Sequence, residues 1–348
     1  MRVLVAMSGG VDSSVAAALM KAEGHDVVGA TLKLWQGPRG EAPTAGCCTL
    51  SDSEDARRVA AQLDIPYYVL DYTSHFRKGV VEKFVADYRQ GWTPNPCVEC
   101  NRTVKFSKLL DQARAFGCDL LVTGHYARVR RTGDRFTLHR GRDPHKDQSY
   151  VLAMLGQEAL SRVRFPVGEL RKEETRAVAA ELGLRTAAKR DSQDICFVGS
   201  GGYRRFLRQQ DPAVLTPGPI RDAAAQVGTH QGVADFTIGQ RRRLGVAMGE
   251  RRYVVGVDST SATITLGGRE DLRVGELHLE QLTWTDHPLV PGCEIEVQYR
   301  AHGRSVPALY HGDRVTFVES EFAIAPGQTA AFYRGDEVLG SGVISATV

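Results

Sequence analysis

The sequence has no long apolar run. Its first apolar stretch, at residues 3–7, is too short for the core of a signal peptide, and no segment approaches the roughly 20 apolar residues that span a membrane. We therefore expect a soluble, cytoplasmic protein with no membrane partner. The 348 residues, 42% of them hydrophobic, are enough for two or three domains with real cores.

Neither sign of charge is in large excess, since the formal net charge is only +3. This balance neither requires nor excludes a nucleic-acid partner, because local basic patches matter more than the total. Arginines gather within residues 128–131, 204–205, 241–243 and 251–252. A solvated surface is the ordinary role of such clusters, and Arg241, Arg242 and Arg243 are the strongest candidates for phosphate contacts.

Cysteine is not used as it is in disulfide-rich proteins. An odd count of seven in a chain expected to be cytoplasmic argues against a disulfide framework and for thiol or metal chemistry. Cys47 and Cys48 are adjacent, so we weigh an auxiliary thiol pair against a chance of composition. Cys118 and Cys293 have the surroundings of core or edge residues, and we assign them no role.

Apolar and amphipathic segments alternate over the first 125 residues. Strand-like runs at 3–7, 27–34, 67–71 and 119–123 are separated by helical patterns at 13–23, 52–63, 75–90 and 103–116. This alternation predicts an α/β fold with a doubly wound parallel sheet, whose ligands bind beyond the carboxyl ends of the strands. Ser51 and Glu54 have the spacing of a capping box at the start of the second helix.

The remainder of the chain predicts two further units. A glycine-rich stretch at residues 199–202 marks the first boundary, so we expect an N-terminal domain over 1–200. Residues 201–268 are short, basic and glycine-punctuated segments, with a helix near 203–210, and predict a small α+β linker domain. Alternating segments separated by Gly and Pro turns predict a C-terminal β-barrel over 269–348.

A phosphate loop follows the first strand. The chain runs through Ser8, Gly9 and Gly10 directly into a helical segment, and glycines beside a helix N-terminus predict an anion site. The loop lacks the Lys-Ser/Thr of a Walker A motif and the Gly-x-Gly-x-x-Gly spacing of dinucleotide binders. It resembles the PP-loop of ATP pyrophosphatases, which cleave ATP to AMP and pyrophosphate by adenylating a carbonyl oxygen. A plain turn between strand and helix is the structural alternative.

A proline-rich segment at residues 93–101 carries Cys97 and Cys100. Its prolines predict a stiff loop that is held out of helix. The Cys-x-x-Cys spacing fits half of a zinc site, a redox dithiol or part of an iron–sulfur cluster. Two inert buried cysteines are the structural alternative.

Further motifs occur in one order along nearly the whole chain. Together with the PP-loop and the Asn-Pro segment that holds Cys100, they resemble the tRNA-specific 2-thiouridylases, the MnmA family. These motifs are residues 123–126, 146–150, 165–168, 195–197, 239–245, 299–300 and 326–328.

The resemblance implies a sulfurtransferase that replaces O2 of the wobble uridine, U34, by sulfur in the lysine, glutamate and glutamine tRNAs. The C2 oxygen is a poor leaving group, and adenylation by ATP turns it into departing AMP. In the family, the cysteine matching Cys196 carries a persulfide from a cysteine-desulfurase-derived sulfur donor. The cysteine matching Cys100 attacks that persulfide and completes the transfer.

Cys97 departs from the family pattern, because many members have an aspartate directly after the Asn-Pro pair. If the fold brings Cys97, Cys100 and Cys196 together, three thiolates can ligate a 4Fe-4S cluster whose fourth iron holds a sulfide. That arrangement resembles the cluster-dependent branch of tRNA thiolases. A persulfide mechanism with Cys97 as a spare thiol, and a zinc site, are the alternatives.

The resemblance also implies which residues bind ATP and tRNA. ATP is expected along Ala6, Met7, Ser8, Gly9, Gly10, Val11, Asp12 and Ser13, with Leu32 beside the adenine and Gly124 near the nucleotide. Asp12 is expected to help hold a Mg2+ ion that bridges the phosphates. The expected tRNA contacts are Asn95, His125, Lys146, Asp147, Gln148, Tyr299, Arg300 and Gln328.

Two other functions fit parts of the sequence. A PP-loop synthetase that adenylates a small-molecule carbonyl shares the ATP chemistry, but it needs neither the pair Cys100 and Cys196 nor a basic barrel. A non-enzymatic RNA-binding protein with a vestigial loop is the second, although Asp12 and both serines stand where an active PP-loop has them.

Overall fold

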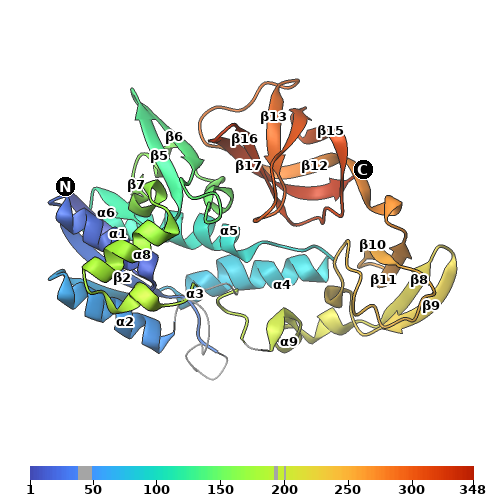
Figure 1. The fold of residues 1–348 in the computed structure, drawn as a ribbon. Helices are drawn as coiled ribbons and strands as arrows, with labels where there is room; N and C mark the ends of the chain where they lie inside the picture. The colour runs from blue at the N-terminus through green and yellow to red at the C-terminus, as the bar shows by residue number, and fades with distance from the viewer. Residues whose placement is uncertain (38–48, 192–194, 200) are drawn as a thin grey trace.

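The computed structural model describes residues 1–37, 49–191, 195–199 and 201–348. These residues form a parallel sheet, a small mixed sheet and a barrel (Figure 1). In Figure 1, α4 (Glu82–Arg89) extends from the N-terminal unit toward the mixed sheet, and the barrel stands above it. No helix within these described ranges is long and apolar enough to cross a membrane.

The N-terminal sheet has the order β3-β2-β1-β4-β7, and all its neighbouring pairs are parallel. Its strands are β1 (Arg2–Ala6), β2 (Asp26–Lys33), β3 (Tyr67–Asp71), β4 (Leu120–Val122) and β7 (Val163–Arg164). The first four confirm the predicted runs. The last has only 2 residues, which is too few for a periodic signal.

Alternate residues of β1 face two different layers of helices. Val3 and Val5 share a core with α1, α2 and α8, whereas Leu4 packs on the opposite side with α3, α4 and α6. Both faces of the sheet are therefore covered, which confirms the doubly wound α/β fold. The bounds are α1 (Val11–Ala22), α2 (Leu50–Gln62), α3 (Thr73–Phe76), α6 (Leu109–Ala115) and α8 (Lys172–Glu181).

The cap of α2 differs from the prediction. Thr49 is the N-cap: its Oγ1 accepts from the backbone N–H of Asp52 at 3.1 Å, and Asp52 Oδ2 accepts from the N–H of Thr49 at 3.0 Å. The capping box expected at Ser51 and Glu54 is wrong, because the same spacing is satisfied two residues earlier. Glu54 instead pairs with Arg57 at 3.0 Å.

Residues 96–100 are helical, contrary to the expected loop. Asn95 caps this helix, α5 (Pro96–Cys100), by accepting from the N–H groups of Cys97 at 3.1 Å and Val98 at 3.4 Å. Pro96 occupies the first helical position, where a missing N–H costs no hydrogen bond. The prolines therefore help to start the helix. The π-helix η2 (Asn101–Lys108) follows directly, and a second π-helix, η1 (Arg77–Val81), precedes α4.

The central part of the chain holds α9 (Gly202–Gln210) and the small mixed sheet. The sheet has the order β10-β11-β8-β9, in which only β11 and β8 are parallel. Its strands are β8 (Gly218–Asp222), β9 (Ala225–His230), β10 (Tyr253–Asp258) and β11 (Thr263–Gly267). The helix and sheet together confirm a small α+β unit.

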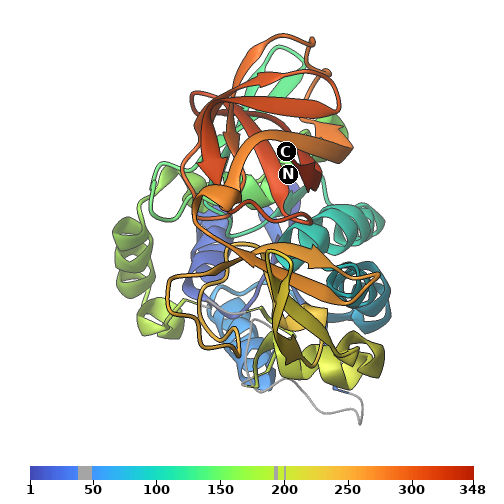
Figure 2. The ribbon, with the colours of Figure 1, turned by 90° about the vertical axis from the view of Figure 1, so that its right-hand side faces the viewer.

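Six strands near the C-terminus close into a barrel, seen from a second side in Figure 2. Their order is β12-β15-β14-β13-β16-β17, and β12 also pairs with β17, which closes the ring. The strands are β12 (Arg273–Trp284), β13 (Glu294–Gln298), β14 (Val306–Tyr310), β15 (Arg314–Phe322), β16 (Thr329–Arg334) and β17 (Glu337–Thr347). The predicted C-terminal barrel is confirmed.

A hairpin from the N-terminal part extends the barrel sheet. Its strands, β5 (Ala127–Thr132) and β6 (Arg135–Arg140), pair with each other, and β6 pairs with β17. Arg128 donates to Asp336 of the barrel at 2.8 Å. One of the arginine clusters therefore contributes to contact within the protein, which the sequence pattern did not indicate.

Candidate active site

The phosphate loop is a closed turn between β1 and α1. The N–H of Ser8 donates to Ser13 Oγ at 3.1 Å, and Ser14 Oγ donates to the carbonyl of Gly10 at 2.8 Å. Gly10 is the N-cap and has no side chain to bond the first amides of α1. Those amides and the helix dipole therefore favour an anion at this end of α1.

Two glycines allow the close packing around this loop. Gly9 has φ +71°, and a Cβ there would lie 2.1 Å from the carbonyl oxygen of Asp52. A Cβ at Gly124 would lie 2.6 Å from the backbone N of Ser13. The backbone just after β4 is thus held against the first turn of α1. Leu32, at the carboxyl end of β2, is 8% exposed.

Asp12 is paired within the protein. Lys172 Nζ donates to both carboxylate oxygens, at 2.7 and 2.8 Å, and the hydroxyl of Tyr126 donates to Oδ1 at 2.7 Å. Burial and the neighbouring Asp12 raise the pKa of Tyr126, so its hydroxyl remains a donor. Lys172 is only 8% exposed and lies far from Asp12 in the sequence, so no local motif indicated this pairing.

The same lysine also reaches Asp191. Lys172 Nζ lies 2.8 Å from Asp191 Oδ1, and Lys146 Nζ lies 2.7 Å from Oδ2. Burial raises the pKa of Asp191, but hydrogen bonds and charges from Lys146 and Lys172 outweigh burial and hold that pKa below its usual value. Lys146, expected to contact tRNA, is therefore tied to the segment that precedes Cys196.

A second lysine, Lys189, also bonds to the phosphate loop. Lys189 Nζ donates to the carbonyl of Gly9 at 2.9 Å and to Asp52 and Asp55 at 2.7 Å each. Burial lowers the pKa of Lys189, but its hydrogen bonds to the two carboxylates raise it overall. Sequence reasoning missed Lys172 and Lys189, because a single lysine in a helical or loop pattern carries no signal of its partners.

The cysteines lie in different environments. Cys97 is exposed in the first turn of α5, whereas Cys100 is buried, and the half-buried Cys196 packs against the same core as Cys100. Over residues 1–37, 49–191, 195–199 and 201–348, no group of three or more His, Cys, Asp or Glu residues is arranged to hold a metal ion. A cluster held by Cys97, Cys100 and Cys196 therefore stays a prediction, whereas Cys100 and Cys196 do share one core.

His125 and Asn95, both expected to contact tRNA, have partners within the protein. Nδ1 of His125 lies 2.6 Å from Thr123 Oγ1, and its ring packs against Phe106 and Phe165 at centroid distances of 5.8 and 5.9 Å. Burial, with a smaller contribution from the charge of Lys105, lowers the pKa of His125 well below its usual value. The imidazole is therefore neutral at physiological pH. Asn95 caps α5, as described above.

Asp147 and Gln148 are engaged in local structure. Asp147 accepts from the N–H of Gly141 at 2.9 Å and from Arg140 at 2.9 Å. Gln148 is exposed, and its Oε1 accepts from the N–H of Tyr126 at 3.0 Å. Both side chains thus support the turn that leads into the 3-10 helix at Ser149–Leu152.

The barrel residues expected to contact tRNA also have partners. Tyr299 donates to Glu321 at 2.6 Å; burial and this bond raise the pKa of Tyr299 to about 12. Arg300 lies over the Tyr299 ring at 5.4 Å and donates to the carbonyl of Phe322 at 3.0 Å. Gln328 Nε2 donates to the carbonyl of Thr93, two residues before Asn95.

The other residues singled out from the sequence are an arginine cluster and three further cysteines. Arg241, Arg242 and Arg243 are exposed side by side in a loop of the central unit. Cys118 is 5% exposed, and burial raises the pKa of its thiol. Cys47 and Cys48 lie outside the described residues.

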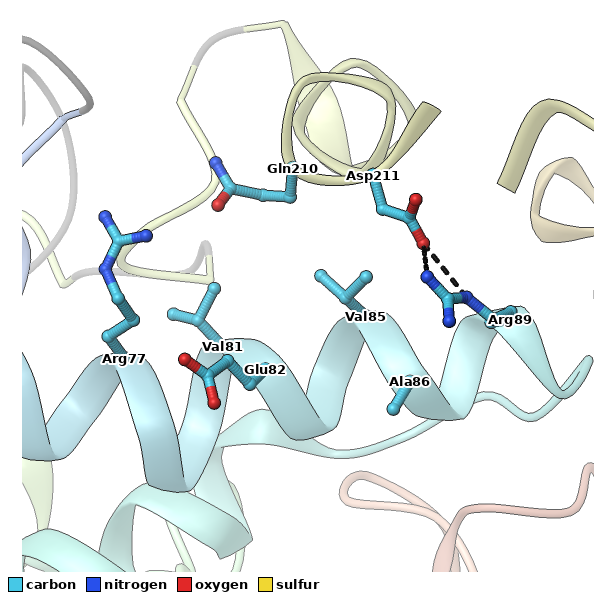
Figure 3. Close-up of a pocket in the computed structure, with 8 residues that line it drawn as sticks. All are labelled: Arg77, Val81, Glu82, Val85, Ala86, Arg89, Gln210 and Asp211. Atoms are coloured by element: carbon cyan, nitrogen blue, oxygen red, sulfur yellow. Dashed lines mark hydrogen bonds and ion pairs between the residues drawn. The ribbon is translucent and has the colours of Figure 1, made fainter. Parts of the chain in front are cut away.

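A separate groove of about 380 Å³ lies between α4 and the end of α9 (Figure 3). Val81 and Val85 form its apolar floor, and an ion pair between Arg89 and Asp211 crosses one end. None of the predicted site residues lines this groove, so we do not assign it to ATP or to the reacting base.

Three family models match successive parts of the chain. They are described as a tRNA methyl transferase HUP domain over residues 1–200, a tRNA methyl transferase PRC-barrel domain over 204–268 and an aminomethyltransferase beta-barrel domain over 274–344. Among solved structures, a U34-tRNA thiolase NcsA from Methanococcus maripaludis, with its 4Fe-4S cluster, is 16% identical with a TM-score of 0.38 over 62% of this chain and 66% of that chain. That likeness is too weak to support a conclusion about a cluster here.

Sequence identity to several named proteins is much higher than the identity to this solved structure. The tRNA-specific 2-thiouridylase MnmA of Roseiflexus castenholzii is 46% identical to this chain, and the aligned region covers 99% of each of the two chains. The proteins of the same name from Geobacter metallireducens and Chloroflexus aurantiacus are also 46% identical, covering 100% and 99% of this chain and 97% and 98% of theirs. Identity at this level over the full length of each relative means that the chain belongs to the tRNA-specific 2-thiouridylase family.

Proposed function

We propose that this enzyme uses ATP to convert the wobble uridine, U34, of tRNA to 2-thiouridine. The observation that carries the proposal is the combination of an anion-binding PP-loop with Cys100 and Cys196 on one core. A small-molecule synthetase accounts for the loop alone, whereas sulfur transfer accounts for both features.

The first step activates the base. The C2 oxygen of uracil attacks the α-phosphorus of ATP, a new P–O bond forms, and pyrophosphate leaves. Backbone N–H groups from Gly9 to Ser13 bind the departing pyrophosphate, since the start of α1 concentrates donors and positive dipole there. Lys172 offsets the charge of Asp12 and thereby limits its repulsion of the phosphates.

The second step transfers sulfur. The terminal sulfur of a persulfide on Cys196 attacks C2, and AMP departs with the original oxygen. The Cys100 thiolate then attacks the Cys196 sulfur, which breaks the S–S bond, leaves sulfur on C2 and joins the two cysteines in a disulfide. A thiol reductant must restore both thiols before the next cycle, and a cysteine-desulfurase-derived donor must reload Cys196.

We derive no step from a 4Fe-4S cluster, because Cys97, Cys100 and Cys196 do not form a ligand group among the described residues. We assign Mg2+ to the phosphates of ATP. Asp12 is the carboxylate within the loop sequence, and both of its oxygens accept hydrogen bonds from Lys172.

The tRNA partner is proposed to lie across all three parts of the chain, which we divide at 1–200, 201–268 and 269–348. Exposed Arg241, Arg242 and Arg243 supply phosphate contacts, and Tyr299 with Arg300 offers a ring and a cation at the barrel surface. Neutral His125 offers its Nε2 to the RNA. Acceptance of the lysine, glutamate and glutamine tRNAs, and a cytoplasmic location, stay predictions.

The test is thiolation of an unmodified lysine tRNA with ATP, Mg2+ and a protein persulfide donor. We expect one AMP and one pyrophosphate per 2-thiouridine, measured by nucleoside mass spectrometry and nucleotide chromatography. The same tRNA with cytidine at position 34 is the matched control and should give neither product. AMP formation that is independent of tRNA, without 2-thiouridine, would favour the small-molecule synthetase instead.

A further inference from the structure

The segment ahead of α5 is held by distant parts of the chain. The N–H of Thr93 donates to the carbonyl of Pro326 at 2.8 Å, and the carbonyl of Thr93 accepts from Gln328 Nε2. The Thr93 hydroxyl lies 3.5 Å from that of Thr237 in the central unit. Both backbone groups of Thr93 are thus bound by one barrel loop, and its side chain faces the central unit.

Steric contact reinforces these hydrogen bonds. Gly327 has φ +88°, and a Cβ there would lie 2.9 Å from Trp92 Cβ and 3.0 Å from Thr93 N. On the central side, a Cβ at Gly91 would lie 2.7 Å from Val257 Cγ1. The barrel loop at residues 326–328 and the segment at residues 91–93 are therefore closely packed, so that a shift of one displaces the other.

Only Pro94 separates Thr93 from Asn95, the cap of α5. Proline has a fixed φ and also restricts the residue before it, so the path from Thr93 to the cap has few rotatable bonds. Asn95 in turn holds the N–H groups of Cys97 and Val98. The position of the barrel loop is therefore transmitted to the helix that presents Cys100.

We propose that Gln328 is a positioning residue for sulfur transfer, acting through Thr93. The inference rests on the proposed function, and it gives Gln328 a role in the RNA-free protein besides the tRNA contact implied by the resemblance. A barrel docked on tRNA thereby aligns α5, and with it Cys100, on the activated uridine. Adenylation at the PP-loop does not pass through this contact, so the two steps should separate.

The first test needs neither RNA nor activity. In the RNA-free protein, Gln328→Leu should make hydrogen exchange in residues 95–100 about fivefold faster, because a hydrogen bond that holds the cap is lost. Gln62→Leu is the matched control: Gln62 Nε2 also donates to a distant carbonyl, that of Leu182, at 2.7 Å. The control should leave exchange in this peptide unchanged.

The second test separates positioning from RNA binding. For Gln328→Leu, we expect the yield of 2-thiouridine per pyrophosphate released to fall about fivefold even at a tRNA concentration that saturates the variant. If Kd rises, exchange is unchanged and product per pyrophosphate is unchanged, Gln328 contacts RNA only and the proposal is overturned.

Gln328→Asn, which keeps an amide but shortens its reach, provides the same comparison if the leucine variant does not fold. An exchange rate equal to that of the wild type in Gln328→Asn would also overturn the proposal. Failure of the underlying function is distinguishable, because the wild type would then make no 2-thiouridine whatever the exchange rates show.

Discussion

Lys172 donates to both carboxylate oxygens of Asp12, at 2.7 and 2.8 Å, and so joins α8 to the first turn of the phosphate-binding helix. The lysine is almost fully buried, and it also reaches Asp191, on the segment that leads toward Cys196. One side chain therefore links the nucleotide loop to the sulfur-transfer region.

Replacing Lys172 by Met should lower the free energy of unfolding by about 2 kcal/mol, because the half-buried Asp12 carboxylate loses its ion pair with Lys172. Affinity for ATP should fall about tenfold, since Asp12 then repels the phosphates. Urea unfolding and equilibrium binding of ATP measure the two effects. Lys78→Met, at an exposed position of η1, is the control. Losses no larger than those of the control would contradict this role.

Gly124→Ala should weaken ATP binding at least tenfold. The new Cβ would lie 2.6 Å from Ser13 N and 2.7 Å from the carbonyl carbon of Asp12, so the start of α1 must move. Gly249→Ala is the matched control, because a Cβ at Gly249 would meet nothing within 4 Å. Calorimetric titration with ATP compares the variants, and equal affinities would show that Gly124 does not border the nucleotide.

The cysteine variants distinguish the persulfide route from a cluster. Cys100→Ser and Cys196→Ser should abolish 2-thiouridine formation, because each removes a sulfur that takes part in the exchange. Cys97→Ser should keep more than about half of the activity with a persulfide donor, since the exposed Cys97 thiol lies outside the proposed pair.

The contrary outcome is equally specific. If anaerobic reconstitution with iron and sulfide is required for activity, and Cys97→Ser abolishes it, then all three cysteines act as cluster ligands. The persulfide route would then be wrong.

His125 should make stability depend on pH. Its pKa lies well below 6.5 in the folded protein, so below pH 6.5 the unfolded chain binds a proton that the folded chain does not. Stability is therefore lost as pH falls below 6.5. Between pH 7 and 5.5 the loss from this residue is about 1 kcal/mol.

Urea unfolding at the two pH values measures this loss. His125→Asn should show about 1 kcal/mol less pH dependence than the wild type, because the titrating ring is gone. His287→Asn is the control, since the side chain of His287 is 88% exposed. An identical pH dependence in His125→Asn and the wild type would refute the assignment of a neutral imidazole.

Several features followed from local sequence alone. The PP-loop was predictable because glycine placement and a strand-to-helix switch are local patterns, and the barrel because alternation with period 2 identifies half-buried strands. The start of α5 was not predicted, although Asn95 and Pro96 are an ordinary N-cap and first position. Proline disrupts the interior of a helix but is favoured at its first position, so the effect of Pro96 depends on where the helix begins.

The sequence by itself determined the α/β alternation, the glycine-containing turn between β1 and α1 and the family to which the chain belongs, because each depends on residues that are near one another or on order along the chain. Only the tertiary structure decided that Lys172 pairs with Asp12, that the hairpin β5–β6 joins the barrel and that Gln328 holds Thr93. These contacts join residues more than 100 positions apart, and their energy depends on burial and distance, which no local pattern contains.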